Sequence, residues 1–118
     1  MEYLYYFENA SLALRSVDYL CGKSQMPKAI VTVIHQIDGW LVRVKMYSNL
    51  NEEQDGDFRA YLNESGIPEE PSRRIKMVFL SLEAGQSPLD IMRRYQVLVV
   101  FHGSLQPQEI QALQQLLI

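Results

Sequence analysis

The fold of this chain is decided by residues 29–47, which read AIVTVIHQIDGWLVRVKMY. Two runs rich in β-branched residues lie on either side of Asp38-Gly39, a dipeptide that tolerates the positive φ angles of a type I′ turn. The stretch therefore predicts a β-hairpin with strands over 29–37 and 40–47. A turn at this dipeptide also fixes the register, and the pairs expected on the core face are Ile37 with Trp40, His35 with Val42, Val33 with Val44, and Val31 with Met46.

The opposite face of the predicted hairpin is mixed in character. Its expected pairs are Gln36 with Leu41, Ile34 with Arg43, Thr32 with Lys45, and Ile30 with Tyr47. These side chains are too apolar for ordinary solvent-exposed surface and too charged for an ordinary core. This face is therefore either a binding surface or a face that other parts of the chain cover.

Toward the N-terminus, the sequence predicts one strand and one helix. Residues 3–7 are rich in aromatic side chains, as is typical of a strand. Asn9 or Ser11 then caps a helix that stops at Gly22. Because Cys21 continues the three-four spacing of the apolar residues, we expect it on the core side; the stripe is Ala10, Ala13, Leu14, Val17, Leu20 and Cys21.

Toward the C-terminus, the elements are shorter and closer together. Capping residues and periodicity predict helices over 53–64 and 88–95, a connector over 67–72, a strand over 97–101, and a last helix that begins at Pro107. Residues 73–84 fit both helical spacing and the alternation of a strand, and Gly85 at their end favours a helix. The strand over 97–101 is apolar on both faces, which is typical of a central strand. The last helix places Ile110, Leu113 and Leu117 on one stripe, opposite a face rich in glutamine.

This order of elements predicts an α+β fold. Apart from two inserted helices, it resembles the split βαβ, or ferredoxin-like, order. We expect a single domain over residues 1–118, with an antiparallel sheet and its helices on one face. In the alternative arrangement, the inserted helices between 71 and 95, or the last helix, fold over the second face and bury it.

Composition limits the class of protein. The chain has 118 residues, 47% of them hydrophobic, with a formal charge of -3, so it can form a globular core and has no overall positive field for nucleic acid. Cys21 is the single cysteine, which excludes an intrachain disulfide and suits a reducing compartment. The N-terminus has no basic signal-peptide region, and no apolar run approaches the roughly 20 residues of a membrane span. We expect a cytoplasmic protein that does not enter the membrane.

Catalytic and metal-binding patterns are not found in the sequence. Cys21 and His35 are expected on core faces, where they act as ordinary packing residues, and His102-Gly103-Ser104 lacks the Gly-x-Ser-x-Gly pattern of a nucleophile turn. The acidic stretch 51–57 lacks the ligand spacing of an EF-hand, and no glycine-rich phosphate loop is present. We therefore predict no catalytic residue, metal or cofactor. A small enzyme or ligand sensor stays as a third alternative, and it requires Cys21, His35 and His102 to meet in one cavity.

Nucleic-acid binding is the second alternative. The two helices within residues 73–95 resemble a helix-turn-helix in spacing. They carry five basic residues, namely Arg73, Arg74, Lys76, Arg93 and Arg94. However, the second helix begins with Leu89 and Asp90 where a DNA-reading helix needs polar donors, and the whole chain is acidic. Nucleic acid is therefore a disfavoured partner.

The favoured interpretation is a protein that binds another protein and catalyses nothing. The mixed face of the hairpin combines Tyr, Leu and Arg, a composition typical of interface hot spots. We expect it to bind a partner protein or peptide, as an adaptor, assembly chaperone or inhibitor does, on the open sheet or by addition to an edge strand. The glutamine-rich last helix also suits packing against a second copy in a homodimer. The expected binding residues are Ile34, Leu41, Arg43, Lys45 and Tyr47, joined by Tyr3 and Tyr5.

Overall fold

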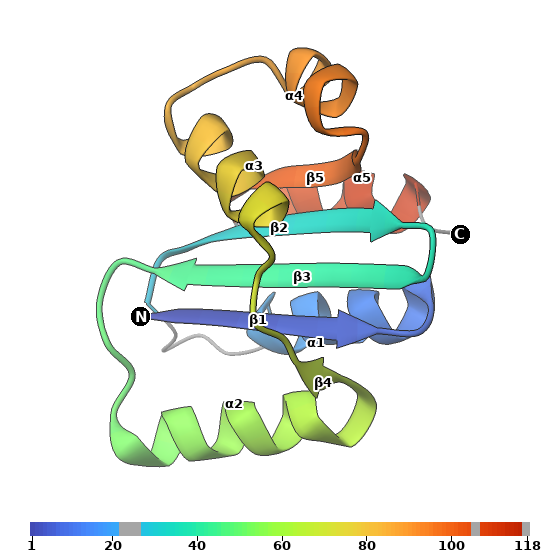
Figure 1. Cartoon of the computed structure of the whole chain (residues 1–118). Coiled ribbons are helices and arrows are strands. Elements are labelled where there is room, and N and C mark those ends of the chain that lie inside the picture. Colours follow the sequence, from blue (N-terminus) through green and yellow to red (C-terminus); the bar gives the residue numbers. More distant parts are fainter. Residues whose placement is uncertain (22–26, 105–106, 117–118) are drawn as a thin grey trace.

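The computed structural model describes residues 1–21, 27–104 and 107–116. It confirms an α+β fold, with a five-stranded antiparallel sheet in the order β4-β1-β3-β2-β5 (Figure 1). The strands are β1 (Glu2–Phe7), β2 (Ala29–Gln36), β3 (Gly39–Met46), β4 (Ile67–Pro68) and β5 (Leu98–Ser104). The helices are α1 (Ala10–Cys21), α2 (Glu52–Ser65), α3 (Arg73–Glu83), α4 (Pro88–Tyr95) and α5 (Pro107–Leu116).

The predicted hairpin is present, but its register is shifted by two residues. Gln36 pairs with Gly39 and His35 with Trp40, so the turn residues are Ile37 and Asp38 rather than Asp38 and Gly39. Tyr6 of β1 explains the shift. Its hydroxyl donates a hydrogen bond to the carbonyl of Asp38, and its ring lies where a Cβ at Gly39 would be.

A shift of two residues keeps every side chain on its predicted face, because the side chains of a strand alternate with a period of two. The valines assigned to the core are therefore buried as predicted: Val31, Val33, Val42 and Val44. The end of the hairpin differs, since Ile37 lies in the turn and is fully exposed. His35 is exposed as well, and its ring stacks on that of Trp40.

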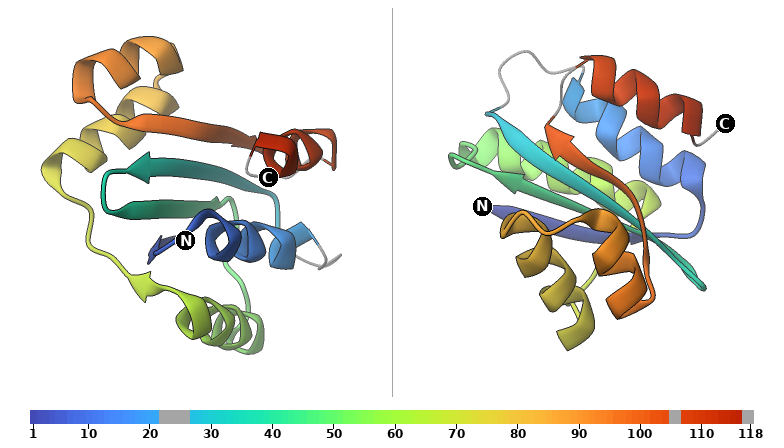
Figure 2. Two further views of the ribbon diagram at one scale, coloured as in Figure 1. Left: turned by 90° about the vertical axis from the view of Figure 1, so that its right-hand side faces the viewer. Right: turned by 90° about the horizontal axis from the view of Figure 1, so that it is seen from above.

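The first face of the sheet is covered by α1, α2 and α5 (Figure 2). Helix α1 is capped by the Asn9 side chain, which accepts a hydrogen bond from the Leu12 amide, and α2 by a capping box between Asn51 and Gln54. The prediction for Cys21 is wrong, because this residue is exposed. It lies about 100° round the helix from the buried Leu20, on the flank of the stripe. Gly22, its predicted stop, and the side chains of Ile110 and Leu117 lie outside the described residues.

The second face is covered by α3 and α4, so the expectation of helices on one face only is wrong (Figure 2). The apolar stripe of α3 accounts for this cover, because a stripe of this kind is stable only when it is buried. Its residues pack on Ile34 and Leu41 of the sheet; they are Ile75, Val78, Phe79 and Leu82.

The strand order also differs from expectation. A split βαβ unit forms, since β3 lies between β1 and β2, the two strands that α1 connects. However, the ferredoxin-like order is not confirmed. The long last strand, β5, pairs with β2 at one edge, and the two-residue β4 pairs with β1 at the other. The prediction of a central strand over 97–101 is therefore wrong: β5 is apolar although it is an edge, because α4 contacts it on one face and α5 on the other.

Candidate functional site

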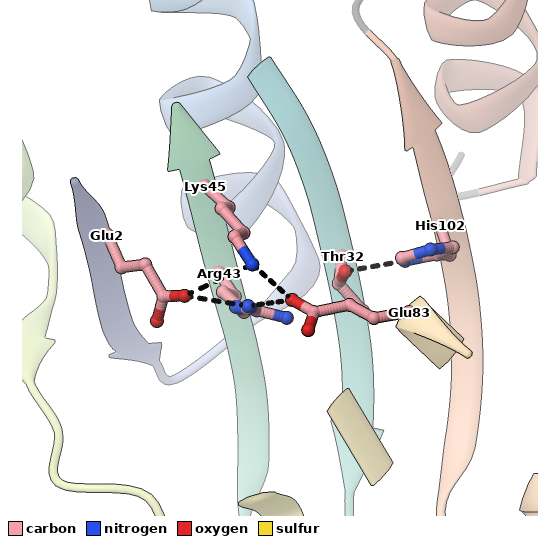
Figure 3. Close-up of polar contacts among 6 residues, drawn as sticks. All are labelled: Glu2, Thr32, Arg43, Lys45, Glu83 and His102. Atoms are coloured by element: carbon pink, nitrogen blue, oxygen red, sulfur yellow. Dashed lines mark hydrogen bonds and ion pairs between the residues drawn. The ribbon is translucent and has the colours of Figure 1, made fainter. Parts of the chain in front are cut away.

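The second face of the sheet changes from apolar to polar along its length. Cross-strand pairing aligns the side chains in three rows. The first row is largely apolar, the second is mixed and the third is polar except for Ile30; they are Tyr6-Leu41-Ile34-Val99, Leu4-Arg43-Thr32-His102, and Glu2-Lys45-Ile30-Ser104. Helices α3 and α4 bury the first row, and Figure 3 shows the polar residues beside it.

Arg43 is the centre of the polar residues. It is only 6% exposed, and its guanidinium lies 4.5 Å from the ring centroid of Phe79 on α3. One terminal nitrogen donates to Glu2 at 2.8 Å and also to Glu83 at the end of α3 (Figure 3). Its Nε is buried without a hydrogen-bond partner among the described residues. Arg43 therefore fastens α3 to strands β1 and β3, and it is not free to bind a partner.

Lys45 completes a charge-balanced cluster. Its Nζ lies 2.8 Å from a carboxylate oxygen of Glu83 and 3.9 Å from one of Glu2. Hydrogen bonds from Lys45 and then Arg43 hold the pKa of Glu83 below its usual range. Two cations thus face two carboxylates, and the cluster as a whole offers no excess charge to a ligand.

Thr32 and His102 extend the polar residues to the edge of the sheet. Thr32 Oγ1 and His102 Nδ1 are 2.8 Å apart, with Thr32 buried and His102 on β5 partly exposed. Burial lowers the pKa of His102, and the positive charge of Arg43 lowers it further, while Glu83 opposes them. These effects favour the neutral imidazole of His102.

The predicted binding residues do not form one open surface. Ile34 and Leu41 are buried beneath α3 and α4. Tyr3 and Tyr5 point to the opposite face, because they alternate with Leu4 and Tyr6 along β1, and they are buried in the first core. Of the remaining three, Arg43 is paired and buried, Lys45 is partly exposed, and Tyr47 is 67% exposed. The expectation that this face is open is wrong.

The basic residues of α3 and α4 are exposed, as the nucleic-acid alternative requires. Within the described part of the chain, none of the five forms a salt bridge: Arg73, Arg74, Lys76, Arg93 and Arg94. They are divided between the first turn of α3 and the last turn of α4. Leu89 and Asp90 occupy the exposed first turn of α4, so this helix does not present a row of donors.

The residues of the enzyme alternative do not meet. His102 lies on the second face of the sheet, whereas His35, three residues along β2 from Thr32, lies on the first. Cys21 ends α1, beside the start of β2, and His35 is near the opposite end of that strand. Among the described residues, no three His, Cys, Asp or Glu side chains are grouped so that they could hold a metal.

The outer edge of β5 is a site that the sequence reading missed. Among the described residues, β5 pairs with β2 alone, so the outward backbone groups of residues 98–103 have no second strand beside them there. All seven residues are at least partly exposed, and Leu98 is 50% exposed. The strand contains no Lys, Arg, Asp, Glu or Pro, the residues that usually protect an edge from pairing. The lack of charged residues and proline in residues 98–104 is the feature of the sequence that could have identified this edge.

Comparisons with known proteins found no matching family model, no matching curated protein and no matching solved structure. None of the described helices has the length and apolar character needed to cross a membrane.

Proposed function

We propose that this protein is a non-catalytic interaction module that binds an extended segment of a partner protein by adding it to the sheet beside β5. The single observation that carries the proposal is a seven-residue edge strand without a charged residue or proline. Over residues 98–103, such an edge offers backbone N–H and C=O groups to another chain, because β2 is the only strand beside them among the described residues. An adaptor, an assembly chaperone and an inhibitor all use binding of this kind.

The surroundings of β5 support this proposal because they hold the strand firmly in place. Its inner side pairs with β2 over most of its length, and helices contact both of its faces. An added strand therefore meets a fixed template, which lowers the ordering cost of binding. The template also has two distinct ends, because β5 begins with apolar residues and ends with His102, Gly103 and Ser104.

The test compares the same substitution at the two edges of the sheet. Leu98→Lys adds a charge to the β5 edge, and Ile67→Lys adds one to the β4 edge, where Ile67 is 61% exposed. We expect partner proteins to be retained from a native lysate by the unaltered chain and by Ile67→Lys, and lost with Leu98→Lys, since an edge lysine blocks strand addition. Hydrogen exchange of the retained complex should show added protection at residues 98–104.

Two results would contradict the proposal. Equal retention by both variants, without added protection of β5, would show that binding takes place elsewhere. Retention that disappears after nuclease treatment and falls with Arg73→Gln or Arg93→Gln would instead support nucleic-acid binding through α3 and α4. Circular dichroism of each variant checks that the fold is kept.

A further inference from the structure

We infer that the segment bound at β5 belongs to a different protein and carries acidic residues at the end that meets α4. This inference rests on the proposed strand addition and names the chemistry of its partner.

Helix α4 places positive charge at the start of the open edge. Arg93 and Arg94 lie in its last turn, a few residues before Leu98, and α4 contacts β5 directly. Both side chains are exposed, and within the described residues neither forms a salt bridge, although Asp90 lies one turn earlier. Together with Gln86 and Ser87, these three residues line an open hollow of about 550 Å³ along α4 itself. A carboxylate there would gain charge-assisted hydrogen bonds from arginine.

The position of α4 determines which end of the partner segment is acidic. In the view from above in Figure 2, the outer edge of β5 faces the viewer, with α4 on one side and α5 on the other. A segment that adds antiparallel to β5 brings its C-terminal end to Leu98 and therefore to α4. We expect its acidic residues, or its terminal carboxylate, at that end.

The apolar part of the segment is expected next to Leu98. Cross-strand pairing aligns Trp40, His35 and Leu98 on the first face, and the rings of Trp40 and His35 stack at 4.2 Å between centroids. This row ends at the open edge. An aromatic or branched apolar residue opposite Leu98 would continue it, since neighbouring side chains on one face of a sheet stabilise each other.

A second copy of this chain does not meet the same requirement. Residues 95–108, which include β5 and its flanks, contain no Asp or Glu, and the next carboxylate along the chain, Glu109, belongs to α5. Pairing two copies of β5 would therefore bring no carboxylate of the paired strand itself to Arg93 and Arg94. The β4 edge is unsuitable for an acidic segment, because Glu69 and Glu70 follow Pro68 there and like charges repel. Charge complementarity therefore favours an acidic segment of another protein at β5.

The test selects peptides from a library of random dodecapeptides displayed on phage, with the full chain as bait. We expect enriched peptides to alternate apolar residues and to end with Asp or Glu. Synthetic versions should protect residues 98–104 from hydrogen exchange. Their affinity should fall at least about tenfold with Arg93→Gln/Arg94→Gln, as expected when charge-assisted hydrogen bonds are lost. The matched control, Arg73→Gln/Arg74→Gln at the start of α3, should leave the affinity unchanged.

The outcomes separate this inference from the proposed function. Peptides that protect β5 but bind both double variants equally would overturn the acidic partner and leave strand addition standing. A selection that yields no peptide protecting β5 would overturn both. Sedimentation that shows a dimer of the unaltered chain, lost in Leu98→Lys, would identify a second copy as the occupant and overturn the inference of a different protein.

Discussion

The two edges of the sheet are built from the same chain and are protected very differently. At one edge, β4 has two residues, contains Pro68, and is followed by Glu69, whose amide donates to the Leu4 carbonyl at 3.0 Å. At the other, β5 has seven residues with neither fixed charge nor proline. A short, proline-containing, acidic edge opposes pairing with other chains, whereas a long neutral edge permits it. Features that oppose pairing with another strand are therefore present at the β4 edge and absent at the β5 edge. The β5 edge is where we propose that a partner binds.

The largest expected change in stability comes from a substitution in α4, the helix that contacts β5. Ile91 is the buried anchor of α4, and Ile91→Ala should destabilise the protein by roughly 2–5 kcal/mol, because it leaves a cavity beneath the helix. Denaturant unfolding gives the free energy. Hydrogen exchange should rise in α4 and β5 more than in β1 and β4. The exposed neighbour Leu89→Ala is the control and should change stability by less than about 0.5 kcal/mol.

The next largest change in stability is expected from a substitution beside β4, at the short edge of the sheet. A Cβ at Gly66 would lie 2.6 Å from the Phe7 ring and 2.9 Å from the Tyr6 carbonyl oxygen, so Gly66→Ala must displace β4 from β1. We expect a loss of roughly 1–3 kcal/mol in unfolding free energy, as is usual for overpacking. Gly56→Ala is the control, since nothing lies near a Cβ there. A stable Gly66→Ala variant with unchanged protection of β1 would contradict this account of the edge.

A smaller effect on stability is expected from the ion pairs that Glu83 forms with Arg43 and Lys45, and it depends on pH. Because Lys45 and Arg43 lower the pKa of Glu83 in the folded protein, Glu83 contributes stability above the pKa of an unfolded glutamate. This stability should be lost as the pH falls below about 4.3 and through the folded pKa. Unfolding midpoints measured against pH should therefore fall more steeply for the unaltered chain than for Glu83→Gln. Parallel curves would show that the Glu83 contacts add nothing to stability.

The smallest effect concerns the charge of the β5 edge itself. Burial and the nearby Arg43 lower the pKa of His102, so the neutral imidazole is favoured in the folded state and the unfolded chain binds the proton more readily. Stability should decline slightly as the pH falls from about 6.5 toward the folded pKa. NMR titration should place the pKa of His102 below the ordinary histidine range.

Much of the local structure could be predicted from the sequence. Asn9, one of the two caps expected for the first helix, caps α1 in the structure, and Pro88 is the first residue of α4 as its position after Ser87 indicated. The alternation within the hairpin also identified the buried valines despite an error of two residues in the register. These features are read from neighbouring residues, so a single sequence contains the information.

The candidate site could be predicted only in part. Arg43 looked like a binding residue because its strand position is next to apolar neighbours, yet Glu2 and Glu83, from distant parts of the chain, pair with it. Tyr47 is exposed as expected, while Ile34 and Leu41 are covered by α3. The strand over 97–101 was recognised as a strand, but its apolar composition suggested the centre of the sheet rather than the edge.

The sequence by itself determined the helices, the longer strands and which side chains of the hairpin face the first core, whereas the two-residue β4 lies in the predicted connector over 67–72. Capping, turn chemistry and periodicity act over a few residues, and they are sufficient for this. Only the tertiary structure decided that β5 pairs with β2, that α3 and α4 close the second face, and that Arg43 is buried in a charge-balanced cluster. These outcomes depend on contacts between segments far apart in the chain. The apolar pattern of β5 fits both an edge strand and a central strand, so the pattern alone could not show which of the two it is.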